Sequence, residues 1–352
     1  MNSKTSLSRR RFLHTTTAAT VASWAVPNVR AQNKSGTKVS LVGTGPFTYE
    51  CDHGFGQLPS NLKWGETHGV TVDGEGFVYV KHNTATSGLK HQDAIVVFDP
   101  TGKFVRSFGD EYSGSGHGID LRKEGTEEFL YLSSFWGRNC VTKTTLNGEI
   151  VWTTSLPWES GVYDEKKNFV PTNVAFAPDG GFFIADGYGS NYIHKYNKDG
   201  KWLKCWGGTG TEPGKFKTPH GLAWDNRKNQ LCVCDRANAR LQYFDADGRY
   251  LSEVTNLLFP AHLDTRGDVM LCPDLHARVT LFDKDNQVIV HLGDDAEWRK
   301  LVLDGFKIRS QPDKWVAGKF VHPHDACFDQ DGNIYIVEWV TVGRVTKLKK
   351  VG

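Results

Sequence analysis

The residues best suited to chemistry are four histidines that share one place in a repeated sequence pattern, namely His68, His117, His220 and His324. Across six copies of the pattern this position reads His, His, Thr, His, Ala and His, although only 13 of the 352 residues are histidine. Neutral imidazole is the commonest metal ligand in proteins, and three histidines with one open position form a catalytic zinc site. We therefore predict that these side chains converge on one metal ion. The alternative is that each histidine belongs to the structural part of the pattern and hydrogen-bonds the backbone between neighbouring copies.

The other histidines fall outside this register. His262 comes one residue later than the aligned position, and we expect it to point elsewhere. His322 precedes His324 by two residues and can reach the same face, because alternate residues of a strand share a face. Six more are expected in turns or outer strands at the surface: His53, His82, His91, His194, His276 and His291.

A repeat of about 51 residues predicts the elements that position the aligned histidines. Each copy has an apolar strand, a turn that is often Asp-Gly, and a second apolar strand; in the fourth copy these strands are 219–225 and 231–235. A third strand follows and ends at an Asp-Gly or Asn-Gly turn, as at 199–200 and 147–148. Such copies are typical of four-stranded propeller blades. We predict an all-β, six-bladed β-propeller in which the start of each innermost strand borders a central channel.

The ends of the repeat region predict how the ring closes. The last copy runs out after residues 344–348, so the early strand 39–42 is free to supply its outer strand and remove an open sheet edge. We expect one domain from 38 to 352, preceded by a polar linker at 32–37. The step between the fifth and sixth copies is the longest, and its excess, 294–316, is predicted to be a charged loop that partly covers the channel.

Composition limits the partners. The formal net charge is +2, from 42 basic and 40 acidic residues, which argues against a nucleic-acid partner. The seven cysteines show no zinc-ribbon spacing, and we expect most of them to be small buried residues. We expect a monomer that binds a small-molecule or peptide substrate.

The first 31 residues resemble an export signal. Residues 8–13, Ser-Arg-Arg-Arg-Phe-Leu, match the twin-arginine pattern, and a modest apolar stretch and a small-residue cleavage site at 29–31 follow. This stretch is too short for a stable membrane span, and no second apolar span exists. The sequence therefore predicts a periplasmic or secreted protein with no membrane span.

Two resemblances to known families are carried by particular phrases. Residues 214–216, Gly-Lys-Phe, with 219–222, Pro-His-Gly-Leu, resemble the NHL-type propeller repeat, whose members are often plain binding scaffolds. A closer resemblance is to the peptidyl-α-hydroxyglycine α-amidating lyase family. It rests on Pro-Thr-Asn-Val at 171–174, Asp-Gly-Tyr-Gly-Ser-Asn at 186–191, Cys-Asp-Arg-Ala-Asn-Ala-Arg at 234–240 and Pro-His-Asp at 323–325, and is specific mainly over 117–245 and 321–338.

The lyase resemblance implies roles for particular residues. It implies a zinc ion on three channel histidines and a structural calcium ion on two backbone oxygens and one carboxylate; the matching residues are His117, His220 and His324 for zinc and Val70, Ile119 and Asp325 for calcium. It also implies that Tyr188 acts as a base and that Arg236 lines the site. The implied reaction splits an α-hydroxyglycine into an amide and glyoxylate, with zinc lowering the pKa of the hydroxyl group that the phenolate deprotonates.

The chain departs from the lyase pattern at three places. The family has a substrate-binding arginine at the end of the second strand of blade one, where this chain has Lys81, which cannot form a bidentate fork. It has a methionine where this chain has His322, and His68 is an additional histidine. A site with four or five histidines can equally hold iron or copper, or leave no open position.

Three functions remain open from the sequence. The first is an exported, metal-dependent carbon–nitrogen lyase of the peptidylamidoglycolate lyase kind. The alternative is a non-catalytic NHL propeller that binds a protein or glycan on its rim. A calcium-dependent hydrolase of the lactonase kind is disfavoured because those channels are acidic and this one is rich in histidine.

Overall fold

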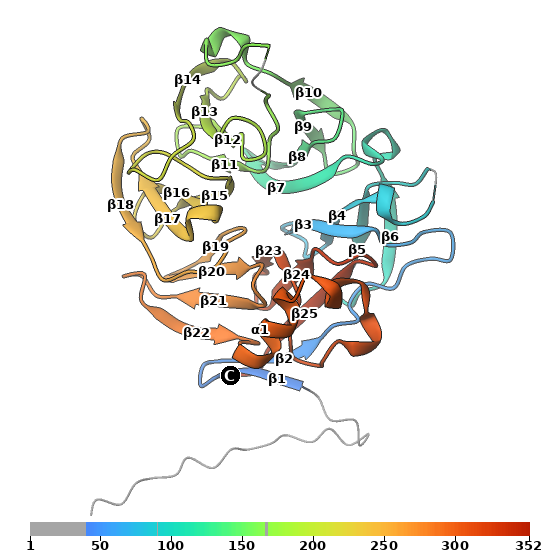
Figure 1. The fold of residues 1–352 in the computed structure, drawn as a ribbon. Helices are drawn as coiled ribbons and strands as arrows, with labels where there is room; N and C mark the ends of the chain where they lie inside the picture. The colour runs from blue at the N-terminus through green and yellow to red at the C-terminus, as the bar shows by residue number, and fades with distance from the viewer. Residues whose placement is uncertain (1–39, 90, 166–167) are drawn as a thin grey trace, which may run out of the picture. The chain divides into compact units, whose positions relative to one another are not determined.

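The computed structural model describes residues 40–89, 91–165 and 168–352, which form six antiparallel sheets around a central channel (Figure 1). The chain is a six-bladed β-propeller, as predicted. The expected signal peptide at 1–31 and linker at 32–37 lie outside the described residues.

The first three blades each contain four consecutive strands. Blade one has β3 (Glu66–Val72), β4 (Val78–Asn83), β5 (Ile95–Phe98) and β6 (Phe104–Phe108). Blade two has β7 (Gly116–Glu124), β8 (Glu127–Ser134), β9 (Cys140–Thr145) and β10 (Ile150–Thr154). Blade three has β11 (Val174–Phe176), β12 (Phe182–Ala185), β13 (Tyr192–Tyr196) and β14 (Trp202–Gly207).

The last three blades complete the ring. Blade four has β15 (Pro219–Asp225), β16 (Gln230–Asp235), β17 (Arg240–Phe244) and β18 (Tyr250–Val254). Blade five has β19 (Asp264–Arg266), β20 (Val269–Asp274), β21 (Arg278–Phe282) and β22 (Val288–Leu292). Blade six has β23 (Pro323–Phe328), β24 (Ile334–Glu338) and β25 (Arg344–Lys350), together with β2 (Phe47–Asp52) and β1 (Ser40–Thr44) from the beginning of the described chain.

Blade six closes the ring by pairing the two ends of the propeller. Strand β2 pairs antiparallel with β25, where Cys51 is opposite Leu348, and β1 lies outside β2. The predicted early strand therefore supplies the outer edge, but a second strand that was not predicted lies between it and β25. Closure leaves no unpaired edge between the first and last repeats.

The core is divided among the six junctions between blades. Each of six buried apolar clusters joins one pair of neighbouring blades; at the junction of blades five and six, Leu271 and Leu281 pack with Ile334 and Ile336. Burial of apolar surface on both sides of every sheet fixes each blade against the next. The inner strands are therefore held rigidly enough to aim side chains at one point.

The long segment after blade five folds over one rim of the channel. It contains helix α1 (Ala296–Leu303), whose N-terminus is capped by the Asp295 carboxylate, and the short 3-10 helices η5 (Lys307–Ser310) and η6 (Pro312–Lys314). Trp298 and Val302 pack into a buried cluster with Val340, so the segment is anchored to blade six. The remaining 3-10 helices are η1 (Thr84–Thr86), η2 (Asp110–Tyr112), η3 (Trp158–Ser160) and η4 (Arg236–Asn238).

Two expectations about single residue types have different outcomes. All seven cysteines are free thiols and five are buried, as expected. The expectation of surface histidines was wrong for His82 and His194, which are buried on β4 and β13, because the second and third strands of a blade are covered on both faces. Among the described residues, no helix is long and apolar enough to cross a membrane.

Candidate functional site

The four aligned histidines lie at irregularities of the innermost strands. In each blade the register shifts at or next to the histidine: between Thr67 and Gly69, Gly116 and Ile119, Pro219 and Leu222, and Pro323 and Asp325. A β-bulge re-aims a side chain out of the regular alternation, and bulges are frequent beside active sites. The shift turns the imidazoles toward the channel axis instead of into the junctions between blades.

Three of the four histidines are oriented in the same way by the next blade. Their Nδ1 atoms lie at hydrogen-bonding distance from a backbone carbonyl of the following blade: His117 to Thr172 at 2.8 Å, His220 to Ala261 at 2.6 Å and His324 to His68 at 2.7 Å. The accepting residues are those that share the aligned position. Because only a protonated Nδ1 can donate to a carbonyl, the Nε2 atom of each ring carries the lone pair.

The arrangement of these lone pairs favours a cation. The three histidines come from blades two, four and six, which alternate around the ring (Figure 1). The Nε2 atoms of His117 and His220 lie 3.1 Å apart, and the ring centroids of His220 and His324 lie 4.7 Å apart. Two acceptor nitrogens at that distance repel each other unless a cation lies between them. Two nitrogen ligands on a tetrahedral zinc are separated by about 3.3 Å, so the residues fit a metal ion.

Glycines after the histidines allow the blades to approach this closely. A Cβ atom at Gly118 would lie 2.5 Å from the Thr172 carbonyl oxygen, and one at Gly221 would lie 2.5 Å from the Ala261 carbonyl oxygen. These are the two carbonyls that orient His117 and His220. The His-Gly pair therefore provides both the ligand and the space for its orienting partner.

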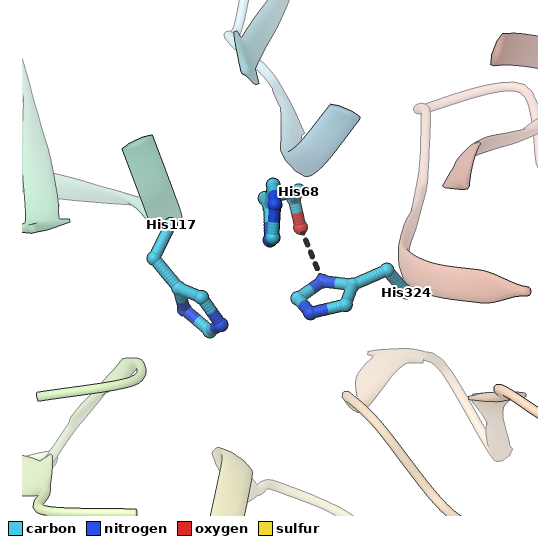
Figure 2. A group of neighbouring side chains, drawn as sticks. All are labelled: His68, His117 and His324. Atoms are coloured by element: carbon cyan, nitrogen blue, oxygen red, sulfur yellow. Dashed lines mark hydrogen bonds between the residues drawn. The ribbon is translucent and has the colours of Figure 1, made fainter. Parts of the chain in front are cut away.

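His68 belongs to the same cluster but is held differently. One ligand nitrogen from each of His68, His117 and His324 lies within 4.8 Å of the others. Figure 2 shows these three side chains close together. Both ring nitrogens of His68 are buried without a hydrogen-bond partner, and Nε2 lies 3.6 Å from a carboxylate oxygen of Glu66. No carbonyl fixes its tautomer. His68 is thus available as a fourth ligand or as a group beside a three-histidine site.

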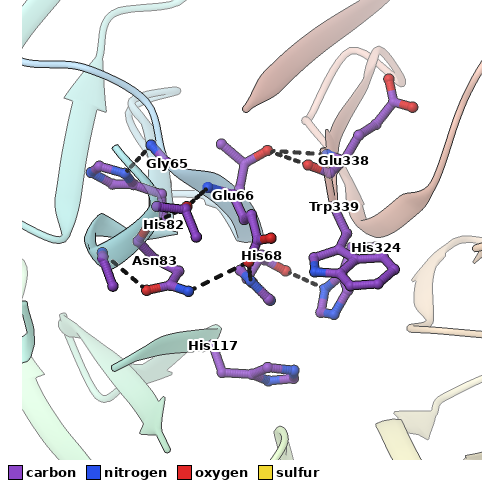
Figure 3. A network of polar contacts seen from close by, with 12 residues as sticks. Gly65, Glu66, His68, His82, Asn83, His117, His324, Glu338 and Trp339 are labelled. Carbon is purple, nitrogen blue, oxygen red and sulfur yellow. Dashed lines mark hydrogen bonds and ion pairs between the residues drawn. The ribbon is translucent and has the colours of Figure 1, made fainter. Parts of the chain in front are cut away.

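Glu66 connects His68 to the covering segment. Its carboxylate pairs with Arg309 of η5. It also accepts a hydrogen bond from Asn83, and this contact belongs to the network in Figure 3. Burial alone would raise the pKa of Glu66, but His68 and Arg309 outweigh it and lower the pKa. The Arg309 guanidinium also lies 3.5 Å from the centroid of the Trp339 ring. The sequence did not predict either Glu66 or Arg309 as part of the site.

Tyr188 and Arg236 lie together directly above the histidines. The Tyr188 hydroxyl is 3.0 Å from Nε2 of His220 and 3.3 Å from Nε2 of His117. Arg236 donates to the same hydroxyl oxygen at 3.2 Å, and its guanidinium lies between the rings of Tyr188 and Phe259. Arg236 pairs with neither Asp186 nor Asp235, so it is held as part of the cavity wall.

The loop that carries Tyr188 is built by a buried carboxylate. Asp186 accepts hydrogen bonds from the backbone N–H groups of Val170 and Ser190, both at 2.7 Å, and from the Tyr163 hydroxyl at 2.9 Å. At Gly187 a Cβ atom would lie 2.0 Å from the Pro219 carbonyl oxygen. The Asp-Gly-Tyr phrase therefore fixes the direction in which the tyrosine leaves β12.

A cavity of about 790 Å³ opens above this cluster and is mainly aromatic. Its walls include the rings of Phe135, Trp136, Tyr188, Phe259, Phe306 and Trp339, and its charged side chains are Glu66 and Arg236. His322 also lines it, as expected, but its Nδ1 lies 2.7 Å from the Leu275 carbonyl oxygen and its ring packs beside Phe306. His276, expected at the surface, lines the cavity as well. Phe306 comes from the segment predicted to cover the channel.

The residues that follow the second strands share one place in the repeat. Phe135 follows β8, Arg236 follows β16, Leu275 follows β20 and Trp339 follows β24. This recurring position is a sequence signal for the cavity wall. Of these four residues, only Arg236 was predicted to line the site.

Lys81 does not supply the charge of the missing arginine. It is fully buried in blade one, where its ammonium donates to the Ser133 carbonyl at 2.6 Å and to the Ser134 hydroxyl at 3.2 Å. Burial lowers its pKa to about 7. Since Lys81 does not line the cavity, Arg236 is the cation among the described residues of the cavity wall that can meet an anionic substrate group.

The residues implied to hold calcium do not fit a calcium ion as they stand. One carboxylate oxygen of Asp325 accepts the Val70 N–H at 3.0 Å, and the other accepts its neighbour Ala326 N–H at 2.7 Å and lies 2.6 Å from Nδ1 of His262. A second cavity, separate from the aromatic one, is lined by Val70, Ile119 and His262. An imidazole therefore occupies the approach to the only carboxylate of the implied set.

Burial sets the protonation of the cluster. The pKa values of His117, His220 and His324 lie well below the ordinary histidine value because the rings are buried, and neighbouring Arg236 and the other histidines lower them further. Neutral imidazole is the form that binds metal.

The chain is similar in sequence to several curated proteins. No family model matches the chain. It is 26% identical over 327 residues to "Peptidyl-glycine alpha-amidating monooxygenase" of Mus musculus, covering 84% of this chain and 32% of the relative. It is 25% identical over 295 residues to "Peptidyl-alpha-hydroxyglycine alpha-amidating lyase 1" of Drosophila melanogaster, covering 79% of this chain and 51% of the relative. The chain thus spans a third to a half of the length of these relatives.

Two further similarities concern the repeat and the fold. The chain is 29% identical over 222 residues to human "NHL repeat-containing protein 3", covering 60% of this chain and 61% of the relative. Virginiamycin B lyase from Staphylococcus aureus superposes with a TM-score of 0.53 at 13% identity, covering 86% of this chain and all of that one. The last likeness shows the propeller fold alone. The chain is therefore an NHL-like six-bladed propeller similar to proteins named amidating monooxygenases and amidating lyases.

Proposed function

We propose that this protein is a metal-dependent lyase that cleaves the C–N bond of a peptidyl-α-hydroxyglycine-type substrate, giving a peptide amide and glyoxylate. The observation that carries the proposal is the set of three Nε2 lone pairs from blades two, four and six beneath the Tyr188 hydroxyl. The similarity to amidating lyases supports the reaction class.

His117, His220 and His324 would hold the metal ion, which we propose is zinc. A zinc ion bound there would act as a Lewis acid that lowers the pKa of a substrate hydroxyl group. The three backbone carbonyls that receive the Nδ1 protons keep the ligand nitrogens deprotonated and fixed in direction. His68 stands beside this set with no orienting carbonyl.

Tyr188 is the proposed base. As the phenolate it takes the proton of the substrate hydroxyl while the C–N bond breaks; the hydroxyl carbon becomes the aldehyde carbon of glyoxylate and the amide nitrogen gains a proton. The Arg236 guanidinium, 3.2 Å from the phenol oxygen, stabilises negative charge on it. No oxidant or water is consumed.

The aromatic cavity supports a substrate with an apolar residue before the hydroxyglycine. Rings on several sides of the cavity can pack against such a side chain, and Arg236 is placed to meet the carboxylate. Because Lys81 is turned away into blade two, we propose that this protein holds the carboxylate less tightly than a site with two arginines would.

Metal analysis with an activity assay tests the proposal. Purified protein should contain about one equivalent of zinc, and it should release glyoxylate from an N-benzoyl dipeptide ending in α-hydroxyglycine; His220→Ala should lose both zinc and activity. His291→Ala, on the outer strand β22, is the matched control and should keep both. A metal-free wild-type protein that folds normally and releases no glyoxylate would favour the rim-binding NHL alternative.

We also propose that the protein acts in the periplasm or outside the cell. The support is the twin-arginine pattern at residues 8–13. Replacing Arg9 and Arg10 by lysine should retain the protein in the cytoplasm of its host, as measured by cell fractionation; unchanged export would contradict the proposal.

A further inference from the structure

His262 lies across the channel between two carboxylates at the end opposite the aromatic cavity. Its Nδ1 atom is 2.6 Å from a carboxylate oxygen of Asp325, and its Nε2 atom is 3.4 Å from a carboxylate oxygen of Asp120. All three residues are more than nine-tenths buried. His262 precedes β19 of blade five, whereas Asp120 and Asp325 lie on the innermost strands of blades two and six.

Both carboxylates already have fixed positions. Asp120 accepts the Val174 N–H of blade three at 2.9 Å, and Asp325 accepts the Val70 N–H of blade one at 3.0 Å. Each therefore joins its own blade to the next one. Both carboxylates are buried, and uncompensated buried charges are strongly destabilising.

We propose that the imidazolium of His262 is the built-in cation of this channel and takes the structural place that a calcium ion would otherwise fill. Each ring nitrogen lies at ion-pair distance from a carboxylate oxygen without a directed hydrogen bond. We infer that the two buried carboxylates hold the ring as the positively charged imidazolium. The ring links blade five to blade two across the channel and to blade six beside it. One side chain thus couples three blades, and the fold needs no divalent ion at this end.

The position of His262 explains why the ring reaches the axis. It comes one residue after the aligned position of blade five, which is Ala261, and Ala261 gives its carbonyl to His220. A Cβ atom at Gly221 of blade four would lie 2.4 Å from the Cα atom of His262, so the glycine leaves room for this backbone. His262 is therefore not one of the proposed zinc ligands, although its neighbour Ala261 orients His220.

Ion content tests the inference in the unmodified protein. After dialysis against chelating resin, mass spectrometry should find calcium far below one equivalent. Addition of 5 mM CaCl₂, about 5- to 50-fold above the Kd of extracellular calcium modules, should not shift the Tm. Zinc is measured in the same sample, so loss of the proposed lyase site would be seen separately. One equivalent of retained calcium, or a Tm that rises with CaCl₂, would overturn the proposal.

A mutant cycle tests the link itself. His262→Gln keeps the volume but not the charge, and its Tm should fall by roughly 10 °C, as for other broken buried pairs. In that background Asp120→Asn should raise the Tm, because it removes one of two unneutralised carboxylates, whereas alone it should lower it. His291→Ala is the control and should change the Tm little. Additive effects of the two substitutions would contradict the proposed ion pair, and so would a His262→Gln protein as stable as wild type.

Discussion

Replacing Tyr188 by phenylalanine separates the proposed base from the metal cluster beneath it. The substitution removes one oxygen, which contacts Nε2 of His220 at 3.0 Å, Nε2 of His117 at 3.3 Å and the guanidinium of Arg236 at 3.2 Å. The ring remains, and with it the stacking against Arg236 and Phe135. Loss of a positioned acid–base group costs about 10²–10⁴ in rate, equivalent to roughly 3–5 kcal/mol of transition-state stabilisation.

The stability of the protein should hardly change. Tyr188 is 38% exposed, and for a residue with this exposure we expect a change in unfolding free energy within about 0.5 kcal/mol. Zinc content should also be unchanged, because the three Nδ1–carbonyl contacts do not involve Tyr188.

The assay is glyoxylate release under saturating substrate, with zinc content and Tm measured on the same sample. Tyr192→Phe, a tyrosine of the same blade outside the cavity wall, is the matched control and should keep full kcat. A Tyr188→Phe protein with wild-type kcat would refute the assignment of the base. A loss of zinc together with activity would also refute it, because the residue would then act through the metal site.

The remaining predictions concern the metal cluster. His220→Ala should abolish zinc retention, whereas His68→Ala should retain zinc because no carbonyl orients His68; equal losses in equilibrium dialysis would make His68 a full ligand. Gly118→Ala should weaken zinc affinity by about 10–100-fold, because its Cβ would displace the Thr172 carbonyl that orients His117. An unchanged zinc affinity in a competition assay would contradict this. Lowering the pH from 7 to 6 should release little zinc, since burial holds the ligand pKa values well below the ordinary value and the rings stay neutral; half-release above pH 6.5 would show that the rings titrate as exposed histidines do.

The fold could be predicted because the propeller repeats its signals. Six apolar strand pairs with Asp-Gly and Asn-Gly turns specify the blade number and the place of the inner strands. The sequence did not predict that β2 lies between β1 and β25, because a single strand outside the repeat has no second copy with which it can be aligned. The same repeat register brought the four aligned histidines together correctly.

The sequence did not predict those parts of the site in which residues far apart in the chain contact each other. Glu66 meets Arg309 and His262 meets Asp120, pairs that no local spacing connects. The expectation that His82 and His194 lie at the surface was wrong for a related reason. Burial in a propeller depends on the neighbouring blade and not on the residue type. Lys81 shows the same limit, because its side chain turns toward backbone carbonyls of blade two instead of the cavity.

Anomalous diffraction from crystals of the zinc-loaded protein, recorded at the zinc absorption edge, tests the central claim most directly. We predict one strong peak on the channel axis, about 2.0–2.1 Å from the Nε2 atoms of His117, His220 and His324, with the Tyr188 hydroxyl on its open side. An empty channel, or a peak bound by a different set of side chains, would contradict it.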